Sequence, residues 1–193
     1  MKLTPELLLT AYAQGIFPMA HDDGQIYWYS PEPRAILPLG QLHTSRSLMR
    51  FIHAGKFEVR FDTAFRDVMV ACAAPRTNGE STWISNEMIE AYTWLHELGF
   101  AHSVECWQDD DLVGGLYGLS LRGLFAGESM FSKRPNASKV ALYYLVRHLQ
   151  QRGFTLLDVQ VLTPHLKRLG AIEISQARYR MLLREALRVE AQF

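Results

Sequence analysis

The sequence predicts a mixed α/β fold, and three consecutive stretches in its second half carry that prediction. Residues 101–130 contain three strand-like runs joined by short turns, which is typical of an antiparallel meander. Residues 137–151 form an apolar helical stretch, and residues 154–162 form a further strand-like run. Because the helix lies between two strands in the chain, we expect it to cover the sheet in which those strands lie side by side.

The first part of the chain predicts a short helix followed by irregular structure. A Thr-Pro-Glu sequence at residues 4–6 is a favourable helix start and Gly15 is a natural end, so we expect a helix over residues 5–14. From residue 15 to residue 34, prolines and aromatic residues alternate too densely for regular structure. We therefore expect a compact, aromatic-rich loop region, whose rings either fill a core or stack on bases.

Alternation and helical spacing predict the remaining elements. In chain order they are a strand over residues 35–39, a helix over 45–54, a strand over 56–62, a helix over 64–73, a polar loop over 75–81, a helix from Ser85 or Asn86 to Gly99, a short helix after Thr163 that ends at Gly170, and a final helix from Ser175 through Leu187.

Composition and cysteine usage describe an ordinary soluble domain. The chain has 193 residues, of which 48% are hydrophobic and 21% are charged, enough to bury a core. Cys72 and Cys106 lie far apart, which argues against a disulfide framework and favours a reducing compartment. No stretch resembles a signal peptide or has the length of a membrane span. We therefore expect a cytoplasmic protein with no membrane partner.

Several common kinds of site lack their sequence signatures. The histidines are scattered without a metal-binding spacing, so we expect no metal. Neither a P-loop nor a dinucleotide-binding glycine pattern occurs, and Ser129 lacks the second glycine of a serine-hydrolase elbow.

The charged residues are segregated along a chain whose formal net charge is zero. No Lys or Arg occurs between Gly79 and Leu121, whereas acidic residues are frequent there. Basic residues gather in two other segments and include Arg46, Arg50, Lys133, Arg134 and Lys139. This pattern is compatible with a surface that holds a polyanion on one side, and equally with scattered solvated charges.

Three polar residues stand at the ends of apolar strands. Side chains alternate across a strand, so Asp158 and Gln160 should point to one face, close enough for the carboxylate to accept a hydrogen bond from the amide NH₂ group. With Glu128, they form a candidate site that accepts or orients a proton from an amine. The alternative is that Asp158 and Gln160 only satisfy buried backbone groups.

Apolar residues around this candidate site fit either a pocket or plain core. They are Leu116, Met130, Leu142, Leu145 and Leu157. A meander, a helix and a following strand are also typical of acetyl-CoA-dependent N-acetyltransferases. In that architecture, glycines before the helix hold the pyrophosphate. Here the corresponding loop is the basic segment Ser132–Asn136, which contains a proline.

A series of motifs resembles one family along nearly the entire chain. The motifs are Gly-Ile-Phe-Pro from Gly15, Trp-Tyr-Ser-Pro-x-Pro-Arg ending at Arg34, Thr-Trp-Ile at 82–84, Gly-Gly-Leu-Tyr-Gly at 114–118, Gly-Glu-Ser-Met-Phe-Ser at 127–132, Ala-Ser-Lys at 137–139, Leu-Asp-Val-Gln at 157–160 and the segment 165–171. Together they resemble the leucyl/phenylalanyl-tRNA-protein transferases.

The resemblance implies a bacterial enzyme that moves Leu or Phe, and less readily Met, from aminoacyl-tRNA to the N-terminal Lys or Arg of an acceptor protein. The product would be degraded by the N-degron pathway. The resemblance also implies a small N-terminal domain (residues 1–34) and an N-acetyltransferase-like domain (residues 35–193). An aminoacyl ester is already activated, so we expect neither a cofactor nor a metal, and we expect a monomer.

The resemblance also assigns roles to the candidate residues. Asp158 would polarise Gln160, Gln160 would contact the attacking amine, and Glu128 would help to hold the amine or the aminoacyl end. The five apolar residues would hold the aminoacyl side chain, and Trp83 and Tyr92 the 3′-terminal adenosine. The five basic residues would follow the phosphates of the acceptor stem.

The chain departs from the family pattern at three places. The chain lacks the glycine-rich N-terminal segment of longer relatives, Met19 stands where many relatives have Trp, and Thr163 replaces a frequent Asn. Two rival functions are a CoA-dependent N-acyltransferase and a non-catalytic RNA-binding module.

Overall fold

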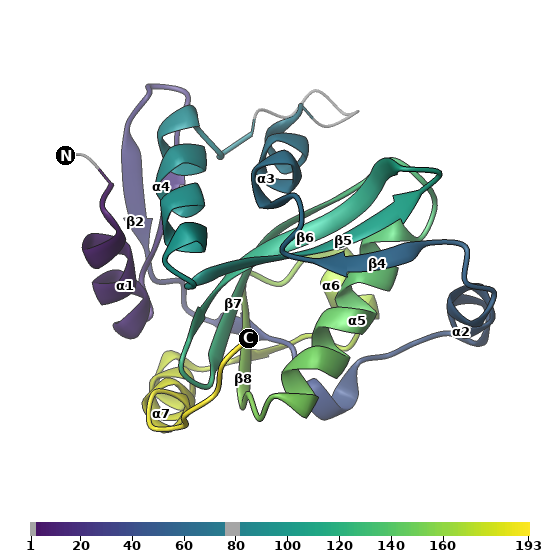
Figure 1. Cartoon of the computed structure of the whole chain (residues 1–193). Coiled ribbons are helices and arrows are strands. Elements are labelled where there is room, and N and C mark those ends of the chain that lie inside the picture. Colours follow the sequence, from purple (N-terminus) through teal and green to yellow (C-terminus); the bar gives the residue numbers. More distant parts are fainter. Residues whose placement is uncertain (1–2, 76–81) are drawn as a thin grey trace.

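The computed structural model describes residues 3–75 and 82–193 (Figure 1). The helices are α1 (Pro5–Ala13), α2 (Arg46–His53), α3 (Phe65–Ala73), α4 (Asn86–Glu97), α5 (Ala137–Gln151), α6 (Pro164–Arg168) and α7 (Gln176–Ala186), with a 3₁₀ turn over Leu39–Gln41. The strands are β1 (Phe17–Ala20), β2 (Ile26–Tyr29), β3 (Arg34–Ile36), β4 (Glu58–Phe61), β5 (Ala101–Gln108), β6 (Asp111–Leu121), β7 (Leu124–Ser132), β8 (Leu156–Gln160) and β9 (Ile172–Ile174).

A mixed sheet forms the centre of the fold. Within the described residues it has seven strands in the order β4-β5-β6-β7-β8-β3-β9. Strands β7 and β8 are parallel and are joined through α5, while the other neighbours are antiparallel. The predicted meander, helix and following strand are therefore confirmed, and so is the mixed α/β class.

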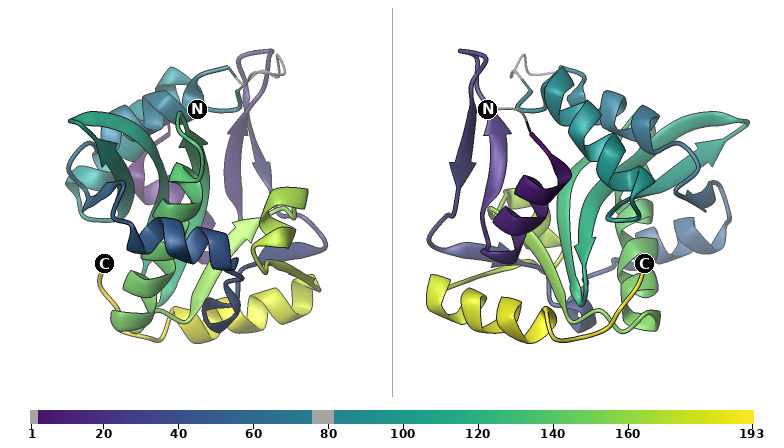
Figure 2. Two further views of the ribbon diagram at one scale, coloured as in Figure 1. Left: turned by 90° about the vertical axis from the view of Figure 1, so that its right-hand side faces the viewer. Right: turned by 60° about the vertical axis from the view of Figure 1, so that its left-hand side comes forward.

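Helices cover both faces of this sheet (Figures 1 and 2). Helices α1, α3 and α4 share one apolar cluster with β6, and α2 and α5 share another with β5, β7 and β8. Helix α7 closes a smaller cluster with β3 and β8. The core is thus divided into layers on the two sides of the sheet. Strands β7 and β8 lie in the middle of the sheet.

The expectation of irregular structure from residue 15 to residue 34 is wrong. Strands β1 and β2 pair as an antiparallel ribbon, with Phe17 opposite Tyr29 and Pro18 opposite Trp28. The rings of Phe17 and Tyr29 stack with their centroids 6.1 Å apart, so the dense aromatic residues form cross-strand pairs. A proline is tolerated here because a strand of a two-stranded ribbon has one unpaired edge.

Two other differences concern short elements. Strand β9 was not expected, because three residues are too few to show a period. Strand β3 begins at Arg34 and lies between β8 and β9 in the large sheet, so the proposed division between residues 34 and 35 falls inside a strand. That division stays a prediction. The polar loop expected over residues 75–81 lies, apart from Pro75, outside the described residues.

Candidate active site

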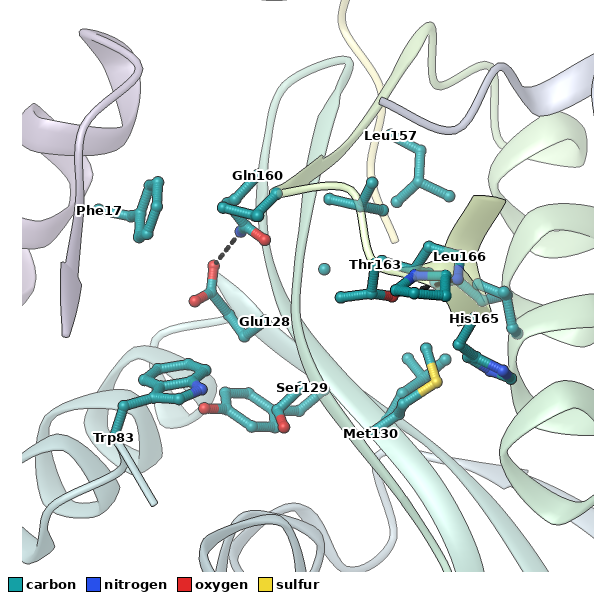
Figure 3. Close-up of a pocket in the computed structure, with 18 of the residues that line it drawn as sticks. Phe17, Trp83, Glu128, Ser129, Met130, Leu157, Gln160, Thr163, His165 and Leu166 are labelled. Atoms are coloured by element: carbon teal, nitrogen blue, oxygen red, sulfur yellow. Dashed lines mark hydrogen bonds between the residues drawn. The ribbon is translucent and has the colours of Figure 1, made fainter. Parts of the chain in front are cut away.

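The parallel strands β7 and β8 diverge and form the walls of a cavity. Their pairing runs from Leu124 with Leu156 to Ala126 with Asp158. Residues 127–130 of β7 and residues 159 and 160 of β8, with Val161 just after β8, line a cavity of about 610 Å³ (Figure 3). A cavity of this size is in the range of small-molecule sites.

The five apolar residues named from the sequence all line this cavity. They are Leu116 from β6, Met130 from β7, Leu142 and Leu145 from α5, and Leu157 from β8. Their shared wall could hold one apolar side chain of moderate size.

The polar end of the cavity contains Gln160 and Glu128, which point toward each other (Figure 3). The Gln160 amide Nε2 donates to Glu128 Oε1 at 3.1 Å. The expected bond from this amide to Asp158 is therefore not present. Instead, Asp158 Oδ1 accepts from the backbone N–H of Gln160 at 3.0 Å, and its side chain is fully buried.

A break in the strand geometry explains this difference. The pairing of β3 with β8 shifts between Ala35, opposite Gln160, and Ile36, opposite Asp158, so the intervening Val159 is a bulge residue. Gln160 has φ = 57°, and Val161 N donates to Val159 O across it at 2.7 Å. This three-residue turn is rare for a non-glycine residue. Strict alternation fails at the place where the two side chains were expected to share a face.

Arg34 and Tyr179 surround Asp158, and sequence reasoning gave neither of them a role. Arg34 Nε donates to Asp158 Oδ1 at 2.9 Å, and Arg34 Nη2 donates to Oδ2 at 2.6 Å. The Tyr179 hydroxyl also donates to Oδ2, at 2.8 Å. Arg34 ended one of the family-like motifs, which was the only sequence signal for it; Tyr179 had none.

Tyr12 is the second buried tyrosine that sequence reasoning missed. Its hydroxyl donates to Glu128 Oε1 at 2.7 Å and shares a hydrogen bond with the Tyr92 hydroxyl. Tyr92 is fully buried, so it is not available to contact an adenosine as the resemblance implied. It supports the carboxylate through Tyr12 instead.

The surroundings of Glu128 favour its neutral form. Burial raises the pKa of Glu128 to about 8, and the charge of Asp158 also raises it. The hydrogen bond from Tyr12 and the charge of Arg34 act in the opposite direction. Glu128 therefore changes its protonation state near neutral to mildly alkaline pH, where an α-amino group also titrates.

This raised pKa makes a prediction about stability. Between about pH 4.5 and 8 the folded protein keeps a proton on Glu128 that the unfolded chain has released, so stability should fall as pH rises through this window. Glu128→Gln should remove this part of the slope and should gain stability over wild type toward pH 8. Urea unfolding from pH 5 to pH 9 measures the effect, with the exposed Glu90→Gln as control. Parallel curves for wild type and Glu128→Gln would contradict the prediction.

Three other candidate positions lie at the cavity. Trp83 and Met19 line it, as does Thr163. The Thr163 hydroxyl also accepts from Leu166 N at 3.2 Å and caps α6, which gives this departure from the family pattern a structural role. Tyr117 also lines the cavity, and its buried hydroxyl has no hydrogen-bond partner within the described part of the chain.

The predicted basic residues are divided among several elements. Lys133 and Arg134 are exposed in the loop between β7 and α5, and Arg46 and Arg50 are exposed on α2. Burial lowers the pKa of His165, which lines the cavity, and the positive charges of Lys139 and Arg168 lower it further. These two charges therefore lie near the cavity. Arg168, which also lines the cavity, was not selected from the sequence.

Two negative findings apply to the described residues 3–75 and 82–193. No group of three or more His, Cys, Asp or Glu side chains there is arranged to hold a metal ion. None of the helices in that part of the chain combines the length and apolarity that crossing a membrane requires.

Comparisons with known proteins define the class of the protein. The chain is 58% identical over 193 residues to the leucyl/phenylalanyl-tRNA–protein transferase of Herpetosiphon aurantiacus, covering 100% of this chain and 98% of the relative. It is 51% identical to the protein of the same name from Rhodospirillum rubrum, covering 100% of this chain and 92% of the relative. The cavity thus belongs to an aminoacyltransferase.

Family models identify it more closely. The model of the leucyl/phenylalanyl-tRNA protein transferase matches residues 36–184, and the model of the N-terminal domain of the same transferase matches residues 1–32. The chain belongs to the leucyl/phenylalanyl-tRNA-protein transferase family, and the predicted family is confirmed.

Two solved structures are distantly similar to the chain. One titled as a GCN5-related N-acetyltransferase from Kribbella flavida has a TM-score of 0.47 at 11% identity and covers 89% of this chain and 61% of that chain. Another, titled as L-PGS from Bacillus licheniformis, has a TM-score of 0.44 at 15% identity, with 81% and 50% covered.

Proposed function

We propose that the cavity holds the aminoacyl end of a charged tRNA and that Gln160 and Glu128 position the amine that attacks it. The observation that supports this is the position of the Gln160–Glu128 pair at one end of a cavity whose remaining wall is apolar. The apolar wall would take a Leu or Phe side chain, and less readily Met. It would disfavour β-branched side chains by shape, an effect of about 1–3 kcal/mol per methylene-sized difference.

The reaction needs positioning and a path for protons. The N-terminal α-amino group of an acceptor protein that begins with Lys or Arg would lie beside Gln160 and Glu128. The neutral amine attacks the ester carbonyl, a C–N bond forms, and the bond to the 3′-terminal ribose oxygen breaks. The amine gives up a proton and the leaving oxygen takes one up. No phosphate bond is cleaved, so the step requires no ATP.

The rest of the tRNA end would follow the surface around the cavity. Trp83 is the candidate to stack on the terminal adenosine, with Met19 beside the same opening in place of a second ring. Lys133, Arg134, Lys139, Arg46 and Arg50 would contact phosphates without reading sequence. We further propose that the protein acts as a cytoplasmic monomer and that its product enters an N-degron pathway.

A transfer assay tests this function. We expect radiolabelled Leu from Leu-tRNA to appear on a peptide that begins with Arg, without ATP or CoA. The same peptide with an acetylated N-terminus should receive none, and Val-tRNA should be a poor donor. Binding of CoA by calorimetry without transfer would instead support a CoA-dependent acyltransferase, and binding of tRNA without transfer would support an RNA-binding module.

A further inference from the structure

We infer that Arg34 and Tyr179 are positioning residues that act through Asp158 to fix the backbone at Gln160, so that the Gln160 amide points into the cavity. The inference rests on the proposed function and deepens it. We refer to Arg34, Asp158 and Tyr179 together as the Asp158 clamp.

The first step is that Asp158 is saturated by protein groups. Its oxygens accept two hydrogen bonds from Arg34, one from the Tyr179 hydroxyl and one from the backbone N–H of Gln160. The Asp158 and Arg34 side chains have no exposed surface, and Asp158 does not line the cavity. Asp158 therefore has neither the access nor a free oxygen to contact a substrate.

The second step is the conformation of Gln160. Its positive φ of 57° is unfavourable for a residue with a side chain, so surrounding contacts must hold it. The Asp158 carboxylate provides such a contact, because Oδ1 fixes the Gln160 N–H at 3.0 Å. In this conformation the Gln160 amide donates to Glu128 at the polar end of the cavity.

The third step is that the clamp is rigid because segments distant in the chain enclose it. The Arg34 guanidinium lies between two rings, 4.9 Å from the Phe17 centroid and 4.4 Å from the Tyr179 centroid. Arg34 Nη1 also donates to Gly15 O at 2.9 Å. A Cβ atom at Gly15 would lie 2.7 Å from Tyr179 Cε1, and φ there is 76°, so this close approach requires glycine.

These contacts indicate that Asp158 holds the Gln160 backbone in place. The carboxylate reaches the Gln160 backbone and not its side-chain amide, so it is not placed to polarise that amide directly. A change in the clamp should therefore alter transfer only by changing the orientation of Gln160.

A double-mutant cycle between Tyr179→Phe and Gln160→Ala tests the inference. Tyr179→Phe removes one hydrogen bond to Asp158 and keeps the ring, so the protein should fold. We expect it to lower kcat for Leu transfer about tenfold, because small misplacements of a positioning group have large effects on rate, and to leave KM for Leu-tRNA unchanged. In the Gln160→Ala background, Tyr179→Phe should have no further effect.

A readout independent of activity completes the experiment. Hydrogen exchange of the Gln160 backbone amide, followed by NMR, should become at least tenfold faster in Tyr179→Phe, because its acceptor is less firmly held. Tyr143→Phe, on the part of α5 outside the cavity lining, is the matched control and should change neither quantity. Equal losses of kcat in both backgrounds, or unchanged exchange at Gln160, would overturn the inference. If the wild-type protein transferred no Leu, the proposed function would be refuted. The hydrogen exchange of the Gln160 amide would still test whether the Asp158 clamp holds the Gln160 backbone.

Discussion

Asp158→Ala should lower the free energy of unfolding by about 3–5 kcal/mol, because it leaves the Arg34 guanidinium charged and unpaired where neither side chain has exposed surface. The nearest remaining acceptors are Gly15 O and the Tyr179 hydroxyl, which carry no charge. Arg34→Met should also destabilise the protein, by leaving the Asp158 carboxylate without its charged partner. Urea unfolding at pH 7 measures both effects.

The surface pair of Arg60 and Glu58 is the matched control for this prediction. Arg60 Nε donates to Glu58 Oε1 at 2.8 Å, but the Glu58 side chain is 64% exposed, so water replaces the partner when it is removed. Glu58→Ala should therefore cost much less stability than Asp158→Ala. If Asp158→Ala cost no more than Glu58→Ala, the buried pair would not be charged as we describe it.

Gln160→Ala should reduce kcat for transfer of Leu to an Arg-starting peptide by about 10²–10³, the range found when one oriented hydrogen-bonding group is lost from an active site. The change removes the amide that donates to Glu128, and it leaves the apolar wall of the cavity intact. The affinity for tRNA should hardly change, because phosphate contacts dominate binding to nucleic acid.

A steady-state transfer assay and a filter-binding assay with Leu-tRNA separate these two quantities. Gln151→Ala, at an exposed position near the end of α5, is the matched control and should keep wild-type turnover. Full turnover in Gln160→Ala would exclude this residue from the reaction and would leave Glu128 as the only carboxylate or amide side chain that lines the cavity within the described chain.

Local sequence patterns predicted the elements whose period is long and regular. The meander at residues 101–130 and the helix Ala137–Gln151 belong to this group, because the spacing of apolar residues repeats over many positions. The β1–β2 ribbon escaped prediction because its prolines and aromatic residues resemble a loop until the opposite strand is known. Its stability comes from cross-strand pairs, which a local pattern does not contain.

The candidate site was predictable in its residue types but not in its connections. Glu128 and Gln160 were expected at a strand end, and they lie together at the cavity. The partner of Asp158 was not foreseen, because Arg34 lies 124 positions away in the chain. Nor does a local pattern reveal that Val159 is a bulge, since the shift depends on pairing with β3.

Tyr179 follows Arg34 by 145 positions in the chain. During synthesis the early segment leaves the ribosome long before α7 does. When Gln160 has just been added to a nascent chain, Tyr179, which donates a hydrogen bond to Asp158, has not yet been synthesised. Competence to modify other proteins should therefore arise only after α7 has been synthesised and has packed against β8.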